Sequence, residues 1–121
     1  MKIEKSTLKW IPAALWGLTI LILTIESNQV IAPPFPMWDK LAHAGAFAVL
    51  SLLLAWPEHK RPIWFWIVFM PMVYGAVIEL AQMQIPHRKG DLLDWGADSL
   101  GSALVFAIII FIRRYNSNRK P

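Results

Sequence analysis

The sequence contains no cysteine and few charged residues. Without cysteine in its 121 residues, the chain has no disulfide, no thiolate metal ligand and no cysteine nucleophile. Charged residues make up 17% of the chain and hydrophobic residues 56%. A soluble domain of this size exposes too much surface to carry so much apolar material. The composition therefore favours one membrane domain over residues 1–121 and leaves no room for a separate soluble catalytic module.

Four apolar runs are separated by prolines and charge clusters. They predict transmembrane helices over about residues 10–27, 40–56, 63–83 and 94–112, which together make an all-α integral membrane four-helix bundle. Pro71 within the third run predicts a kink. The uncharged parts of the last three runs have 16, 16 and 14 residues, against about 20 needed to span a bilayer. To cross, these helices must include the polar turns at their ends.

The lysines and arginines form short clusters between the apolar runs instead of a basic stripe, which argues against nucleic-acid binding. If all four runs span the membrane, nine of the 12 lie on the side that holds both termini. The excess predicts that both termini are cytoplasmic. The alternative is a cleavable signal peptide over residues 1–26, but the apolar run ends in Glu26-Ser27-Asn28 with no small-residue cleavage site directly after it.

Acidic residues show the opposite bias. Six of the eight fall in the turns predicted to lie at the outer side. They are Glu26, Asp39, Glu79, Asp91, Asp94 and Asp98. Ionisable groups at this depth are tolerated when they face the bundle interior or a wet cavity and pair with one another. We therefore expect the outer turns to form one polar cluster.

Helical spacing supports this convergence. Asp39 and His43 are four residues apart and share a helix face, while Asp91, Asp94 and Asp98 follow a 0, 3, 7 pattern that makes one acidic stripe. The stripe requires that the fourth helix begin before Asp94. Asp94 is also a suitable N-cap for that helix, which would give it a purely structural role.

Two further groups belong to the predicted cluster. Glu79 and Gln82 lie three residues apart at the end of the third run, and Arg88 is the natural counter-ion of Asp91 or Glu79, unless it is an ordinary loop charge. Small residues would allow the helix backbones to approach closely around the cluster. These are Gly45, Gly75, Ala97 and Gly101.

Taken in order, these residues resemble the pattern of the VanZ-like family of small bacterial membrane proteins. The similarity covers about residues 35–112 and rests on the motifs Asp39-Lys40-x-x-His43-x-x-x-Phe47, Glu79-x-x-Gln82 and Arg88-x-x-Asp91-x-x-Asp94-x-x-x-Asp98-x-x-Gly101. The resemblance implies a multi-pass protein of the bacterial cytoplasmic membrane. Through the family's namesake it also implies a link to low-level teicoplanin resistance. Asp98 departs from the family pattern, which usually has Asn there.

The first functional hypothesis is an enzyme that acts at the outer face on a membrane lipid or a lipid-linked cell-envelope precursor. The catalytic residues would be His43, Glu79, Asp94 and Asp98, with His43 or Glu79 as general base and Asp39 orienting His43. The substrate-binding residues would be Asp39, Lys40, Gln82, Arg88 and Asp91. Within this set, Lys40 and Arg88 would hold a phosphate or carboxylate.

Three points stay open at this stage. The carboxylates suit a divalent cation such as Mg²⁺, but neither a His-x-x-x-His pair nor a nucleophile elbow is present, so the sequence leaves the metal and the reaction class undetermined. The second hypothesis is non-enzymatic binding of an envelope ligand. The third is a structural or assembly role, in which the polar cluster only joins the helices. The oligomeric state is not predicted.

Overall fold

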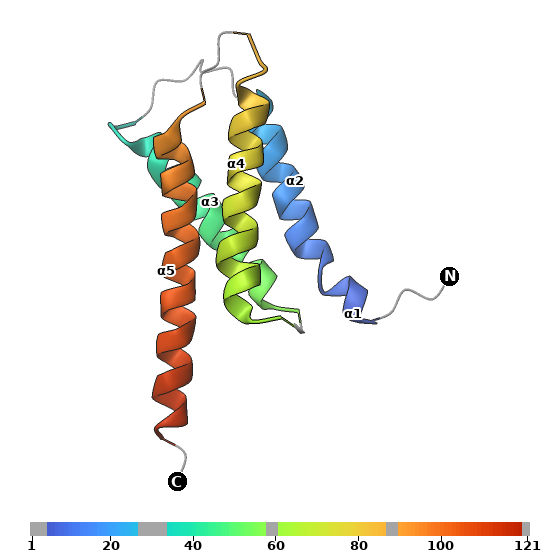
Figure 1. The fold of residues 1–121 in the computed structure, drawn as a ribbon, viewed down its shortest axis with the longest axis vertical. Coiled ribbons are helices and arrows are strands. Elements are labelled where there is room, and N and C mark those ends of the chain that lie inside the picture. Colours follow the sequence, from blue (N-terminus) through green and yellow to red (C-terminus); the bar gives the residue numbers. More distant parts are fainter. Residues whose placement is uncertain (1–4, 27–33, 58–60, 87–89, 120–121) are drawn as a thin grey trace.

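The computed structural model describes residues 5–26, 34–57, 61–86 and 90–119. These residues form helices and turns without any strand, which confirms the all-α prediction. The elements are α1 (Lys5–Leu8), α2 (Ile11–Glu26), α3 (Trp38–Ala55), the π-helical segment η1 (Phe65–Phe69), α4 (Met70–Gln82) and α5 (Leu92–Ser117). Segment η1 continues directly into α4. The four long helices alternate in direction, so the ends of α2 and α4 lie near the starts of α3 and α5 (Figure 1).

Three of the helices are long and apolar enough to cross a membrane: α3, the combined η1–α4 helix and α5. Helix α2 is also apolar but has 16 residues. At 1.5 Å per residue it is ~24 Å long, against about 30 Å of hydrocarbon. It therefore spans only if flanking residues or a locally thinner bilayer make up the difference.

Helix α5 is longer than predicted at both ends. The Asp91 side chain accepts a hydrogen bond from the Leu93 N–H (2.8 Å), so the helix begins at Leu92 and Asp91 is its N-cap. The hypothesis that Asp94 is the N-cap is therefore wrong, and Asp94 lies in the first turn. At the other end the helix continues through Arg113 and Arg114, since arginine is a good helix former and no glycine or proline interrupts it.

The third predicted helix contains a π-helical turn just before Pro71. Proline has no N–H, so Pro71 cannot donate to the carbonyl of Ile67, four residues earlier. Ser51 on α3 supplies a donor instead: its Oγ lies 2.8 Å from the Ile67 carbonyl oxygen, and both residues are buried. The Ile67 carbonyl, whose α-helical donor position is occupied by proline, thus accepts a hydrogen bond from a neighbouring helix. Backbone polar groups in the membrane interior need such partners.

Three aromatic side chains also donate to backbone carbonyls of neighbouring helices. The bonds run from Trp16 Nε1 to Ala46 O (2.9 Å), from Tyr74 Oη to Gly17 O (2.6 Å) and from Trp95 Nε1 to Met72 O (2.9 Å). They connect α2 to α3, α4 to α2 and α5 to α4. In a membrane protein each such bond stabilises helix association by about 0.6–1.7 kcal/mol.

Helices α3 and α5 make the closest backbone approach. An ideal Cβ built on Gly101 would lie 2.9 Å from the Ala44 carbonyl carbon and 3.0 Å from its Cα, and closer still to its oxygen. Only glycine fits at this crossing, because any Cβ would overlap the facing backbone. The prediction that small residues permit close approach is confirmed at Gly101. At Gly45 it is not, because the space around it is open.

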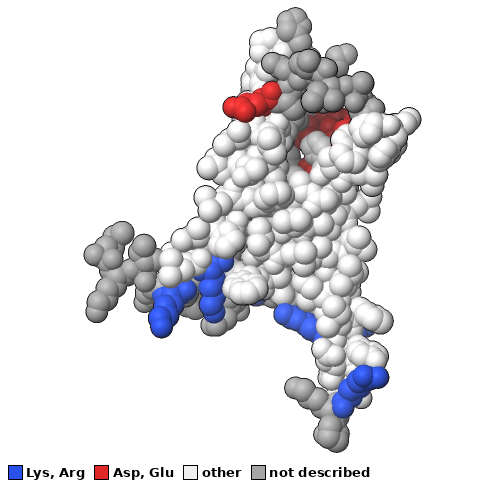
Figure 2. Space-filling view, turned by 180° about the vertical axis from the view of Figure 1, so that it is seen from behind, with Lys and Arg blue, Asp and Glu red and all other residues white. Residues whose placement is uncertain are grey.

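Charge is separated between the two ends of the bundle (Figure 2). The acidic end, formed by the ends of α2 and α4 and the starts of α3 and α5, carries Glu26, Asp39, Lys40, Glu79, Asp91, Asp94 and Asp98 among the described residues. The basic end carries Lys5, Lys9, Arg61, Arg113, Arg114 and Arg119. The surface between the two ends carries few charges (Figure 2) and many large hydrophobic side chains of the described residues are exposed, as expected of helices that face lipid.

Candidate functional site at the acidic end

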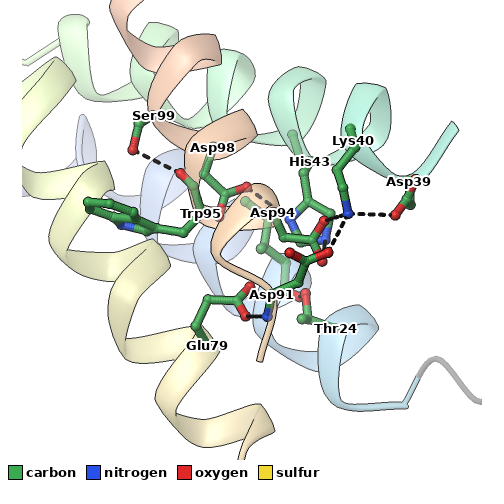
Figure 3. Close-up of polar contacts among 12 residues, drawn as sticks. Thr24, Asp39, Lys40, His43, Glu79, Asp91, Asp94, Trp95, Asp98 and Ser99 are labelled. Carbon is green, nitrogen blue, oxygen red and sulfur yellow. Dashed lines mark hydrogen bonds and ion pairs between the residues drawn. The ribbon is translucent and has the colours of Figure 1, made fainter. Parts of the chain in front are cut away.

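The first turns of α3 and α5 face each other and bring most of the predicted polar cluster together (Figure 3). Helix α3 contributes Lys40 and His43, three residues apart on one face. Because α5 begins at Leu92, the stripe from its N-cap Asp91 through Asp94 and Asp98 is continuous and faces α3. The two elements are joined at this point by ion pairs and hydrogen bonds.

Lys40 is the centre of one half of the cluster. Its Nζ lies 2.9 Å from Asp39 Oδ2 and 2.7 Å from Asp91 Oδ2, and it also contacts Asp94 Oδ1. An ammonium group has three hydrogen-bond donors, so these carboxylates use all of them. The hydrogen bond from Lys40, together with the one from the Leu93 N–H, lowers the pKa of the Asp91 carboxyl. Lys40 is thus a counter-ion within the protein, with no donor left for a ligand.

His43 is the centre of the other half. Its Nδ1 lies 2.9 Å from Asp98 Oδ1, and its Nε2 lies 3.8 Å from Asp94 Oδ2. The first distance is a hydrogen bond, while the second is an ion-pair distance beyond hydrogen-bond length. Our sequence hypothesis that Asp39 orients His43 is therefore wrong. Asp39 shares the helix face but pairs with Lys40, whereas the carboxylate on His43 comes from α5.

Asp98 is the most deeply placed group of the cluster, with none of its side chain exposed. Its Oδ1 contacts His43, while Oδ2 has no hydrogen-bond partner among the described residues. Oδ2 lies against α4 at Gly75, where an ideal Cβ would come within 2.9 Å of it. The absence of a side chain at Gly75 therefore makes the space that the Asp98 carboxyl occupies.

Glu79 and Gln82 on α4 line the same end. The buried Glu79 accepts a hydrogen bond at Oε2 from the Asp91 N–H (2.8 Å) and so attaches α4 to the start of α5. The Gln82 amide nitrogen is 3.4 Å from the Thr24 carbonyl oxygen. With its amide turned over, the nitrogen lies 3.3 Å from both Glu79 oxygens, which gives the carboxylate a second donor. The predicted binding residue Arg88 lies outside the described residues.

The described part of the chain contains no group of three or more His, Asp or Glu residues arranged to hold a metal ion. The arrangement around Lys40 gives a physical reason, since three of the carboxylates converge on its ammonium. The suggestion that the cluster binds Mg²⁺ stays a prediction.

The sequence model of the VanZ/LLP1 family matches residues 3–113. The chain belongs to the VanZ/LLP1 family. The resemblance inferred from the three motifs is therefore confirmed, and the length and composition of its helices make this VanZ/LLP1 chain a membrane protein. No curated protein and no solved structure gives a significant match.

Two residues that support the site in this VanZ/LLP1 protein were missed by sequence reasoning. Trp95 lies between Asp94 and Asp98 in the sequence, and its indole N–H connects α5 to α4. In one of the two orientations of the Gln82 amide, its nitrogen lies 3.4 Å from the carbonyl oxygen of Thr24 on α2. No sequence signal identifies Thr24, because a backbone carbonyl is present at every position. The position of Trp95 beside Asp94 was the only indication of its role.

Proposed function

We propose that this VanZ/LLP1 protein acts on a membrane lipid or a lipid-linked cell-envelope molecule by proton transfer at His43. The observation that carries the proposal is the hydrogen bond between His43 Nδ1 and the fully buried Asp98. When Nδ1–H donates to the carboxylate, Nε2 is the nitrogen that can accept a proton. A fixed tautomer with one free nitrogen is the arrangement expected of a general base.

The exposure of the two partners supports the same assignment. Asp98 is fully covered, whereas His43 retains 21% of its side-chain exposure, so His43 is the member of the pair that a ligand can reach. Asp94 Oδ2, 3.8 Å from Nε2, would stabilise the imidazolium formed after proton transfer. A ligand headgroup that entered the acidic end would meet these groups near the level where lipid headgroups lie.

The substrate-binding assignments change accordingly. Because its three donors are engaged, Lys40 positions Asp91 and Asp94 in this proposal and does not itself hold an anion. The anion-binding role then falls to Arg88, on the sequence argument alone. We further propose that the acidic end faces outward from the bacterial cytoplasmic membrane, because the basic end carries most of the lysines and arginines.

The test is a comparison of envelope lipids and lipid-linked precursors in bacterial strains with equal expression. The strains are wild type, a deletion, and the deletion complemented with the native gene, His43→Gln or Gln84→Ala. Gln84 is an exposed residue at the same end and serves as the matched control. We expect one species to change on deletion and to recover with the native gene and Gln84→Ala only. Full recovery with His43→Gln would contradict the proposal.

A second comparison tests the orienting role of Asp98. Asn at this position keeps an oxygen that accepts from Nδ1–H, whereas Leu has a similar size and no acceptor. Asp98→Asn should therefore retain most of the complementing activity and Asp98→Leu should lose it. Equal activity of the two variants would mean that the hydrogen bond is not needed for function.

A purely structural role is the second candidate, favoured by the three contacts of Lys40, which all lie within the protein. Under this alternative, His43→Gln would lower the thermal stability of the purified protein and change the lipid profile only in proportion to the lost protein. Under the proposed function, His43→Gln alters the profile at unchanged stability and abundance. Thermal unfolding of His43→Gln thus distinguishes the structural role from the proposed function.

A further inference from the structure

A cavity of about 370 Å³ lies at the basic end, on the opposite side of the bundle from His43. It is lined by Leu8, Lys9, Pro12, Leu53 and Trp56. None of these residues belongs to the acidic cluster, and the proposed function does not use them. The cavity is large enough for part of a small amphipathic ligand, since ligand pockets commonly begin at about 300 Å³.

The cavity forms because the chain changes direction at two places. Helix α1 ends at Leu8, and a turn at Lys9 and Trp10 separates it from α2, so α1 leaves the line of α2 (Figure 1). On the other side, α3 ends at Ala55, just before Trp56 and Pro57. The walls are therefore the start of α2, the end of α1 and the end of α3.

The lining combines apolar walls with one cation. Four of its five residues are apolar or aromatic and Lys9 is the fifth. Trp56 is 76% exposed and Leu8 is 48% exposed, which is costly in water and favourable against lipid. Such a surface suits a lipid whose chain contacts the walls and whose phosphate meets the ammonium group.

Further basic and aromatic side chains lie at the same end of the bundle. Lys5 is exposed on α1 at the same end. The Arg61 guanidinium lies 5.1 Å from the centre of the Phe65 ring, which contacts Trp66, which in turn contacts Trp10 beside Lys9. Tryptophan and basic side chains together are typical of the membrane interface on the side with anionic lipid.

We propose that this cavity binds an anionic phospholipid from the leaflet at the basic end. The part of an acyl chain nearest the headgroup would lie against Leu53 and Trp56, and the phosphate would lie near Lys9. The excess of basic residues at this end, including Lys5, Lys9 and Arg61, is what favours an anionic lipid over a zwitterionic one. The inference is independent of the proposed function, since it uses no residue of the acidic end.

The experiment is native mass spectrometry of the full chain purified in detergent, with phosphatidylglycerol or phosphatidylcholine of the same acyl chains added. We expect wild type to retain phosphatidylglycerol in preference. Lys9→Gln should weaken phosphatidylglycerol binding about fivefold, the effect expected of one basic residue near an anionic lipid, and leave phosphatidylcholine unchanged. Arg114→Gln removes an exposed cation of α5 at the same end and is the matched control, with less than a twofold effect expected.

A second variant tests the cavity itself. Leu53→Phe places a larger side chain in the apolar wall, keeps all charges and should reduce retention of phosphatidylglycerol. Circular dichroism and thermal unfolding verify that the variants fold. The proposal is overturned if wild type retains both lipids equally, if Lys9→Gln behaves like Arg114→Gln, or if a dimer without lipid is the species observed.

Discussion

The close contact between α3 and α5 leads to a sharp prediction for Gly101→Ala. The added Cβ would lie 2.9 Å from the Ala44 carbonyl carbon, whereas carbon atoms in contact prefer about 3.5–4.0 Å. The helices must therefore separate by about 1 Å. Ala44 follows His43 directly, and Asp98 precedes Gly101 by less than one turn, so the shift acts on the hydrogen bond between them. Its length would increase from 2.9 Å to about 3.9 Å, beyond hydrogen-bond range.

We expect Gly101→Ala to destabilise the protein by about 1–3 kcal/mol, the usual effect of overpacking, and to abolish complementation in the lipid assay. Two measurements check this. Thermal unfolding in detergent reports the stability, and the ¹⁵N chemical shifts of the His43 ring, assigned by comparison with His43→Gln, report the hydrogen bond to Asp98. The matched control is Gly96→Ala on the same helix, where a Cβ meets no atom within 4 Å.

In that control the substitution should be neutral or stabilising by up to about 1 kcal/mol, because alanine is the better helix former. The reasoning is refuted if Gly101→Ala and Gly96→Ala have the same stability, or if the ring nitrogen shifts of His43 are unchanged in Gly101→Ala. Either result would mean that the two helices are not held together at the distance described.

Three further substitutions have distinct expected outcomes. Gly75→Ala places a Cβ 2.9 Å from Asp98 Oδ2 and should displace the carboxyl, with loss of complementation at a smaller loss of stability than Gly101→Ala. Ser51→Ala leaves the Ile67 carbonyl without its donor and should lower the unfolding free energy by about 1–2 kcal/mol without changing the lipid profile. Lys40→Met leaves three carboxylates without their counter-ion and should destabilise by about 1–3 kcal/mol, less than for a fully buried ion pair, as measured by denaturant unfolding.

The sequence was sufficient to predict the helical architecture and that the polar residues of the stripe on α5 lie on one face, because both follow from periodicity. Apolar runs locate the helices, and the 0, 3, 7 spacing of Asp91, Asp94 and Asp98 places them on one face once the helix starts early enough. The start itself was uncertain, since Asp is a suitable N-cap at either Asp91 or Asp94. The contact of Asp91 with Glu79 on α4 fixes where α5 begins, and local sequence does not reveal a contact between two helices.

Pairings within the cluster could not be predicted from spacing. Asp39 lies four residues before His43, which indicates proximity on a helix, but the partner of a side chain is whichever group the tertiary fold brings closest. Asp39 pairs with Lys40, and His43 forms its hydrogen bond with Asp98 from another helix. The depth of Asp98 depends in turn on Gly75, whose role appears only when α4 is placed beside α5.

The hydrogen bonds between helices have a consequence for how this fold would vary in evolution. In each of four cases the donor is a side chain and the acceptor is a backbone carbonyl: Trp16 to Ala46, Ser51 to Ile67, Tyr74 to Gly17 and Trp95 to Met72. Every residue type supplies a carbonyl, so a hydrogen bond of this kind constrains the donor position and leaves the acceptor position free to change. Pairwise covariation between sequences would therefore fail to detect these contacts, although they connect all the long helices.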